Sequence, residues 1–352
     1  MMKFLIIKPS SLGDVLHAFP AVHALCRAFP GSRADWLINP AFQDLLDYLP
    51  SVDRRIVFQR KKMGTVNGFF QEFPALYRNL HLERYDAVID LQGLLRSAFF
   101  SACCKSPIHA GPLCCKEKLS RLFYNRKMTW PEQTFHALEK NNQMIQSLYP
   151  DQHFDFNFQL PEHPAALASF HQLLEKQKDT IRKIKGKKWI GIAPGARWDS
   201  KQWEPEFFAR MIWYMAQKQP DSVFFIFGSA DEAASAGIIL ENTGNIPVIN
   251  LTGMTGMLQL VEGIRAMDLL IANDSGPMHI AASAGTPVAA FFGPTRPDLT
   301  GPYTERKRIF QPQLTCICCF KRYCESKECH RAIDPDAAAE QSLTLMEEIS
   351  RP

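Results

Sequence analysis

Repeated units of a short apolar strand, a turn and an amphipathic helix run through this chain and limit its fold more than any other feature. In the first half we expect strands at Phe4–Ile7, Ala34–Ile38, Arg55–Phe58 and Ala87–Leu91, and helices near residues 21–28, 41–48 and 69–79. In the second half we expect strands at Trp189–Ala193, Val223–Gly228, Val248–Asn250, Leu269–Ala272 and Val288–Phe292, and helices near 205–216, 233–241, 257–266 and 278–284. This alternation predicts an α/β fold built from parallel βα units.

The length of 352 residues favours two domains. Residues 174–189, LEKQKDTIRKIKGKKW, form a highly charged stretch that we interpret as a surface helix and linker. We therefore expect an N-terminal domain over residues 1–185 and a C-terminal domain over 186–335. The last amphipathic helix, in residues 336–352, is expected to pack back onto the first domain.

Composition excludes several classes of protein. A hydrophobic content of 46% excludes a disordered chain, and a net charge of +4 is too small for a general nucleic-acid binder, although it permits local basic surfaces. The first residues lack the long apolar region of a signal peptide, and no segment approaches the ~20 apolar residues that span a bilayer. We expect a cytoplasmic chain whose ten cysteines are mostly reduced.

The turn after the first predicted strand carries Ser10, Ser11, Gly13 and Asp14. Turns at the carboxyl ends of parallel strands line the crevice where open α/β sheets bind ligands. One glycine does not make a dinucleotide-binding fingerprint, and the Asp14 carboxylate would repel a diphosphate. Asp14 is suited to accept a proton from a substrate hydroxyl, with a helix N-cap as the structural alternative.

Two turns of the second half have the composition of an anion site. Gly195 and Ala196 allow close backbone approach, and Lys201 stands before a helix that starts at Pro205, although a solvated surface lysine is the alternative. The second turn places Asp274, Ser275, Gly276 and Pro277 between a buried strand and the helix that contains His279. Free backbone N–H groups, a hydroxyl and an imidazole would together bind an anion there, whereas helix capping and a buried histidine are the structural alternatives.

These residues and several longer motifs resemble glycosyltransferase family 9, the ADP-heptose:lipopolysaccharide heptosyltransferases. The motifs are KPSSLGDVLHAFPAV near the start, YDAVIDLQGLLRSA at 85–98, SRLFYNRK at 120–127, PGA with SKQW around Lys201, and NDSGPMHIAASAGTPVAAFFGPT up to residue 295. LQGLLRSA and LFYNRK favour the heptosyltransferase I branch. The resemblance implies a GT-B fold, two Rossmann-like domains with parallel sheets facing a central cleft, with the acceptor in the first domain and the nucleotide sugar in the second.

The resemblance also implies roles for individual residues. Asp14 corresponds to the general base, and Lys201 corresponds to the lysine that holds the donor phosphates. The implied nucleotide-sugar site comprises Gly195, Ala196, Glu232, Met254, Asp274, Ser275, Gly276, Pro277 and His279. The implied acceptor site comprises Ser10, Ser11, Gly13, Arg60, Lys61, Lys62, Gln92 and Arg126.

Basic clusters in the first half agree with an acidic acceptor. Residues 53–62 contain five basic residues and one acid, and residues 105–127 contain six basic residues and one acid. Such clusters suit sugar carboxylates and lipid phosphates, as in Kdo-lipid A. Phe69, Phe70 and Phe73 lie nearby, where they either meet acyl chains and the membrane surface or form a packed helix face.

A cysteine-rich segment near the C-terminus has no place in the predicted sheets. Its ligand-type residues are Cys316, Cys318, Cys319, Cys324, Cys329 and His330. They would suffice for one tetrahedral zinc, but the spacing is not a standard zinc pattern, so structural zinc, disulfides and free thiols are all alternatives. We expect no catalytic role, because the segment lies beyond the sheet that builds the donor site.

The sequence as a whole predicts an inverting, metal-independent transfer of heptose from ADP-heptose to a Kdo sugar of the lipopolysaccharide inner core. We expect no required cofactor and no nucleic-acid partner. We do expect peripheral contact with the inner membrane. The rival hypotheses are a family member with another acceptor, a nucleotide-sugar enzyme of the same scaffold with another donor, and a non-catalytic nucleotide-binding protein.

Overall fold

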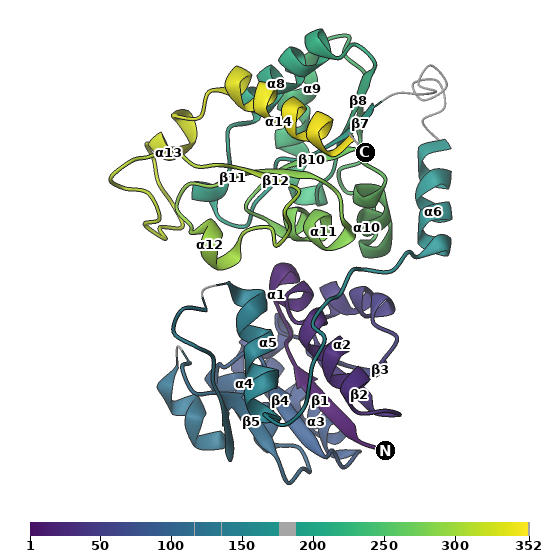
Figure 1. Ribbon diagram of the computed structural model, residues 1–352, viewed down its shortest axis with the longest axis vertical. Coiled ribbons are helices and arrows are strands. Elements are labelled where there is room, and N and C mark those ends of the chain that lie inside the picture. Colours follow the sequence, from purple (N-terminus) through teal and green to yellow (C-terminus); the bar gives the residue numbers. More distant parts are fainter. Residues whose placement is uncertain (116, 135, 176–187, 351–352) are drawn as a thin grey trace. The chain divides into compact units, whose positions relative to one another are not determined.

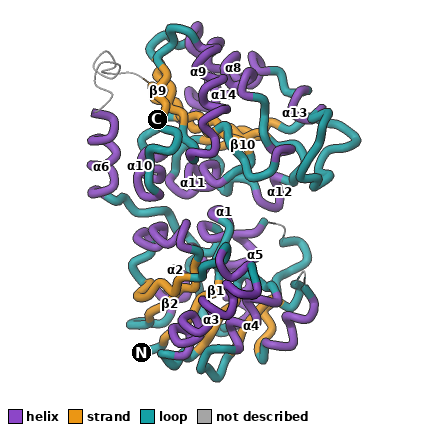
Figure 2. The backbone as a smooth tube through the Cα atoms, turned by 180° about the vertical axis from the view of Figure 1, so that it is seen from behind, coloured by secondary structure: helices purple, strands orange, loops and turns teal. Residues whose placement is uncertain are grey.

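Each half of the chain folds around its own parallel sheet, as the strand–turn–helix pattern predicts (Figure 1). The computed structural model describes residues 1–115, 117–134, 136–175 and 188–350. Its two units comprise residues 1–159 and 160–352. In Figure 2 the strands of each unit are flanked by helices, the layering of a doubly wound α/β domain.

The first unit contains a six-stranded sheet. Its strands are β1 (Lys3–Ile7), β2 (Arg33–Ile38), β3 (Val52–Val57), β4 (Ala87–Asp90), β5 (His109–Pro112) and β6 (Arg126–Met128). Its helices are α1 (Leu12–Leu16), α2 (Phe19–Ala28), α3 (Val66–His81), α4 (Leu95–Ala102) and α5 (Ala137–Leu148), with the 3₁₀ helices η1 (Pro40–Tyr48), η2 (Lys62–Gly64) and η3 (Lys118–Phe123). The last four residues of β1 are fully buried, which is typical of a central parallel strand covered on both faces.

The second unit repeats this plan. Its strands are β7 (Lys188–Ala193), β8 (Ser222–Ile226), β9 (Val248–Asn250), β10 (Leu269–Asn273), β11 (Val288–Phe291) and β12 (Lys307–Phe310). Its helices are α6 (Pro164–Glu175), α8 (Pro205–Lys218), α9 (Ala233–Thr243), α10 (Met257–Arg265), α11 (Gly276–Ala284), α12 (Pro297–Thr300), α13 (Glu328–Arg331) and α14 (Pro335–Ser350), with η5 (Asp199–Lys201) and η6 (Ala230–Glu232). In its core the rings of Trp203, Phe291 and Phe310 stack, and Phe208 packs edge-on against Trp203 and Phe291.

The strand order locates the ligand-binding edge of each sheet. The orders are β3-β2-β1-β4-β5-β6 and β12-β11-β10-β7-β8-β9, and all the pairings are parallel. The direction of winding reverses between β1 and β4 in the first sheet, and between β10 and β7 in the second. Open α/β sheets bind ligands outside the carboxyl ends of the strands at such a switch point. The fold is therefore the predicted α/β, GT-B architecture of two Rossmann-like domains.

The expected strands and helices are confirmed, but three short strands were missed. β5 contains glycine and proline, and β6 and β12 begin with basic residues, so none of them has the continuous apolar run of a buried parallel strand. β6 and β12 lie at sheet edges, where only one side of the strand needs a partner. The helix predicted near residues 41–48 is present as the 3₁₀ helix η1.

The division between the two units differs from the expected boundary. The division falls at residue 160 rather than near 185, because α6 packs with α10 and Gln259 donates a hydrogen bond to Ser169 (2.8 Å). The predicted linker over residues 176–187 lies outside the described residues. Within the second unit the C-terminal helix α14 packs on α8, held by the ion pair between Arg210 and Asp336 (2.7 Å).

Candidate active site

The turn between β1 and α1 holds Asp14 in a defined orientation. Ser11 is the N-cap of α1, and Asp14 stands at its third helical position rather than at the cap itself. Asp14 Oδ2 accepts hydrogen bonds from the backbone N–H (2.7 Å) and the hydroxyl (2.8 Å) of Ser11. In the described part of the chain Asp14 Oδ1 makes no hydrogen bond, so one oxygen fixes the side chain and the other is available to take a proton.

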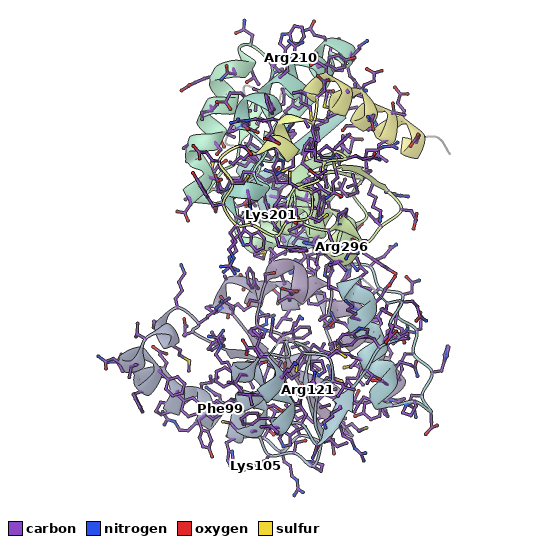
Figure 3. The ribbon with its side chains drawn as sticks, turned by 90° about the vertical axis from the view of Figure 1, so that its left-hand side faces the viewer. Phe99, Lys105, Arg121, Lys201, Arg210 and Arg296 are labelled. Carbon is purple, nitrogen blue, oxygen red and sulfur yellow. The ribbon has the colours of Figure 1, made fainter. Side chains whose placement is uncertain are left out.

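Arg60 and Arg96 lie beside this turn, and a third arginine, Arg121, lies in η3. Arg60 Nη1 donates to the Ser10 hydroxyl (3.4 Å). Arg96, in the first turn of α4, lies over the Phe58 ring (5.0 Å), and its pKa is lowered mainly by burial and next by the charge of Arg60. Arg121 Nε in η3 is buried without a hydrogen-bond partner among the described residues; Figure 3 labels this residue. Sequence reasoning missed Arg96 and Arg121, although both fall inside the motifs LQGLLRSA and SRLFYNRK.

Gln92 follows β4 in a turn that a buried carboxylate organises. Asp90 Oδ1 accepts the backbone N–H groups of Gln92 (2.8 Å) and Gly93 (3.1 Å), and Oδ2 accepts the hydroxyl of Tyr124 (2.7 Å). Burial raises the pKa of Asp90. Gly93 has a φ of +69° and a Cβ there would run into Pro112, so this turn requires glycine.

Three predicted acceptor residues make no hydrogen bond or ion pair with Asp14 among the described residues. Lys61 is exposed just before η2, and Lys62 forms an ion pair with Glu72 (3.2 Å). Arg126 is exposed on β6, which is three strands away from β1. At ~4.8 Å per strand this separation is about 14 Å. β4 and β5 thus lie between the Arg126 strand and β1.

At the switch point of the second sheet, Lys201 meets Asp274. Lys201 lies in η5 after β7, Asp274 follows β10, and Lys201 Nζ is 2.6 Å from Asp274 Oδ2. Thr295 donates its hydroxyl to the same oxygen (2.6 Å). The Lys201 ammonium also lies over the Trp198 ring (4.8 Å); Figure 3 labels Lys201. Both ends of the pair are largely buried, so the ammonium is held at the sheet edge rather than solvated.

The turn after β10 supplies further donors. Ser275 is the N-cap of α11, Gly276 and Pro277 open the helix, and the buried His279 lies in its first turn. The Ser275 hydroxyl is buried and has no hydrogen-bond partner among the described residues. A helix start with an uncommitted hydroxyl suits a phosphate oxygen.

Glu232 lies in η6, after β8, and its carboxylate packs against Gly195 and Gly228. Its carboxylate accepts the Ser229 N–H (2.6 Å), and a Cβ at Gly195 or Gly228 would overlap it. A Cβ at Gly195 would therefore displace the Glu232 carboxylate. Ala196 accepts a hydrogen bond from Gln202 Nε2 (2.8 Å) through its carbonyl.

Met254 lies in the turn after β9, next to this edge. The neighbouring Gly253 N–H donates to the Gly228 carbonyl (2.8 Å), and the Met254 side chain is 42% exposed. The structure thus places Met254 near the Gly228 turn, where an apolar side chain is open to contact.

Comparison with known proteins decides the family. The family model for glycosyltransferase family 9 (heptosyltransferase) matches residues 74–330. The chain belongs to glycosyltransferase family 9. Lipopolysaccharide heptosyltransferase 1 of Pseudomonas aeruginosa is 29% identical over 92% of this chain and 87% of its own length, and lipooligosaccharide heptosyltransferase 2 of Campylobacter jejuni is 27% identical over 98% of each. The solved structure of Escherichia coli heptosyltransferase WaaC with ADP has the same fold, with a TM-score of 0.69 and 23% identity over 88% of this chain and 92% of that one.

In this glycosyltransferase the cysteine-rich segment packs directly on the Lys201 loop. The Ser200 hydroxyl donates to the Lys321 carbonyl (2.6 Å), and His330 Nε2 donates to the Ser200 carbonyl (2.9 Å). The Trp203 indole donates to the His330 carbonyl (3.0 Å). The segment was expected to lie beyond the sheet that builds the donor site; in the structure it contacts Ser200, the residue that precedes Lys201.

The cysteines of this segment do not form a metal cluster or disulfides in the structure. All ten cysteines are free thiols. Across the described residues, no three His, Cys, Asp or Glu side chains are placed to hold a metal ion. Burial lowers the pKa of His330, so its imidazole is kept neutral against Ser200. No helix of the described ranges is long and apolar enough to cross a membrane.

Proposed function

We propose that this enzyme transfers heptose from ADP-heptose to a Kdo sugar of the lipopolysaccharide inner core, with inversion at the anomeric carbon. The observation that carries the proposal is the pair of switch points, one presenting Asp14 with an uncommitted oxygen and the other presenting Lys201 beside Asp274. The Pseudomonas aeruginosa relative is a lipopolysaccharide heptosyltransferase 1, and the Escherichia coli structure contains ADP.

In the proposed step, the acceptor hydroxyl loses its proton to Asp14 Oδ1 as its oxygen attacks the anomeric carbon of heptose. The bond from that carbon to the diphosphate oxygen breaks on the opposite face, and ADP leaves with the electron pair. The negative charge that develops on the diphosphate is stabilised by Lys201, the Ser275 hydroxyl and the N–H groups at the start of α11. Donors held in place in this way are typically worth about 3–4 kcal/mol each in the transition state.

The Lys201–Asp274 pair prepares the cation for this role. Without the Asp274 carboxylate and the Thr295 hydroxyl bound to it, the lysine side chain would move freely at the sheet edge. We propose that the reaction needs no divalent metal, because Lys201 supplies the positive charge and the sequence has no paired-aspartate metal motif near these turns.

The choice of a Kdo acceptor over a heptosylated one rests on the branch motifs. LQGLLRSA and LFYNRK favour the type 1 branch, whereas the Campylobacter jejuni relative is a type 2 enzyme. Arg60, Arg96 and Arg121 lie in or near these motifs and supply positive charge for an acidic acceptor.

An acceptor competition tests the proposal. The enzyme is incubated with ADP-heptose and equal amounts of Kdo-lipid A and heptosyl-Kdo-lipid A, and mass spectrometry identifies which one gains a heptose. Gain on Kdo-lipid A supports the proposal, and gain only on the heptosylated acceptor assigns the enzyme to the second step instead. UDP-sugars in place of ADP-heptose test the donor, with the Asp14→Asn variant as the inactive control.

We also propose peripheral contact with the inner membrane through the outer face of α3 and η3. Phe70 is 72% exposed and Leu122 is 81% exposed, whereas Phe69 and Phe73 stack on each other (4.8 Å) and pack against the core of the first unit. Exposed apolar side chains beside basic ones are typical of interfacial binding. Phe70→Ser with Leu122→Ser should reduce sedimentation with anionic vesicles and leave ADP affinity unchanged; unaltered sedimentation contradicts this surface.

A further inference from the structure

Lys8 is a buried cation at the switch point of the first sheet, and the proposed transfer step does not use it. It follows β1 directly, and only 7% of its surface is exposed. Its Nζ donates to the Leu91 carbonyl (2.7 Å), which follows β4. Because β1 and β4 are the two strands at which the winding reverses, the ammonium lies across the carboxyl edge where an α/β sheet takes its ligand.

The charge of Lys8 has no anionic partner among the residues that the structure describes. An ammonium carries three donors, and the Leu91 carbonyl takes one of them. Among the described residues, no carboxylate oxygen lies within 4.0 Å of Lys8 Nζ. A buried charge without a counter-charge is destabilising unless a ligand supplies one. A neutral donor would tie β1 to Leu91 at lower cost, so the lysine is not explained by that hydrogen bond alone.

The surrounding backbone holds Lys8 in place. The Trp36 indole donates to the Lys8 carbonyl (3.1 Å), and the Asn39 N–H donates to the Pro9 carbonyl (3.1 Å). Next to Leu91, Gln92 Oε1 is buried and has no hydrogen-bond partner among the described residues. The turn after β4 therefore contributes both the carbonyl that holds the Lys8 ammonium and an unused acceptor in the next residue, Gln92. This combination fits a ligand that carries an acidic group and a hydroxyl.

We propose that Lys8 binds the carboxylate of the acceptor sugar and so determines the specificity for an acidic sugar. This inference rests on the proposed function, which supplies an acceptor with one carboxylate on the reacting sugar. A single ammonium matches the single negative charge of a carboxylate. The doubly charged phosphates of the lipid would instead pair with the more exposed arginines Arg60 and Arg96. With the carboxylate on Lys8 and a ring hydroxyl donating to Gln92, the sugar is oriented at the edge that also carries Asp14.

The test compares two acceptors that differ in this carboxylate alone: the Kdo acceptor and the same compound with its carboxyl group reduced to a hydroxymethyl group. Parent, Lys8→Gln and Lys8→Arg are assayed with both. Gln keeps a donor for the Leu91 carbonyl without the charge, and Arg keeps the charge. Lys3→Met, at the opposite end of β1 and bound to Asp35 and Glu83, is the matched control for loss of a lysine from this strand.

For the parent, kcat/KM should be about 10- to 100-fold lower with the reduced acceptor, as expected for losing a hydrogen-bonded charge pair. Lys8→Gln should show a loss of the same size with the Kdo acceptor and little further loss with the reduced one. Lys8→Arg should retain part of the discrimination, and Lys3→Met should retain all of it. An equal loss by Lys8→Gln on both acceptors, or no loss on either, would overturn the inference.

A binding measurement separates this inference from the proposed function. Calorimetry with free Kdo and its carboxyl-reduced alcohol reports on Lys8 without any heptose transfer, and ADP affinity should be equal in all the variants. Lys8-dependent binding of Kdo by a protein that transfers no heptose to Kdo-lipid A would refute the proposed function alone. Transfer by the parent with no effect of Lys8→Gln on Kdo affinity would refute the role of Lys8 alone.

Discussion

Replacing Asp14 by Asn separates the chemical role of this residue from its structural one. In the structure Asp14 Oδ2 accepts two hydrogen bonds from Ser11, and an Asn side-chain oxygen can accept both. The lost stability is then mainly the interaction of the charge with the start of α1, about 0.3–1 kcal/mol. The lost activity should be far larger, about 10²- to 10⁴-fold for removal of a general base, which corresponds to about 2.7–5.5 kcal/mol in the barrier.

Ser11→Ala is the matched control. It removes the hydroxyl bond to Asp14 (2.8 Å) but keeps the carboxylate, so it should lower the free energy of unfolding by about 1 kcal/mol, as much as Asp14→Asn or more. Its loss of kcat should be much smaller than that of Asp14→Asn, even if acceptor KM changes. Steady-state transfer kinetics, urea unfolding and ADP calorimetry on the three proteins measure the three quantities. Equal activity losses in the two variants would show that Asp14 acts only by shaping the turn, and full activity of Asp14→Asn would remove it from the mechanism.

Three further predictions follow from the second unit. Lys201→Met should raise the donor KM, lower kcat or do both, while acceptor KM stays the same; a change confined to acceptor kinetics would contradict its pairing with Asp274 at the phosphate site. His330→Gln keeps a donor for the Ser200 carbonyl but cannot titrate. Burial lowers the pKa of His330, so only the unfolded parent takes up a proton there as pH falls through about 6.5. The parent should therefore lose stability below that pH, and the variant should lose less. Parallel pH profiles of the two proteins in thermal unfolding would refute this. Metal analysis and a thiol titration should find no bound metal and ten free thiols. Cys324 should be alkylated early, because its hydrogen bond with Ser326 lowers its pKa. One equivalent of zinc or missing thiols would show that the cysteine-rich segment differs from the structure.

Several of the candidate residues were predictable because of how parallel sheets are built. Buried strands such as Phe4–Ile7 and Leu269–Ala272 have continuous apolar runs, so their ends can be found in the sequence. In a parallel sheet, all the turns that follow strands lie on one edge, so Asp14 and Asp274 could be assigned to ligand-binding edges without coordinates. The short strand β6 could not be found this way, because an exposed edge strand with basic residues has no such run.

What the sequence by itself determined is local: which segments form strands and helices, which turns carry polar residues, and which motifs belong to the family. The tertiary structure decided what depends on long-range packing. Strand order places Lys201 on Asp274, and the position of residues 321–330 against Ser200 gives the cysteine-rich segment a place beside the donor loop. The isolation of the Lys8 ammonium also became visible only in three dimensions, because whether a charge has a partner depends on every strand and turn around it and not on its neighbours in the chain.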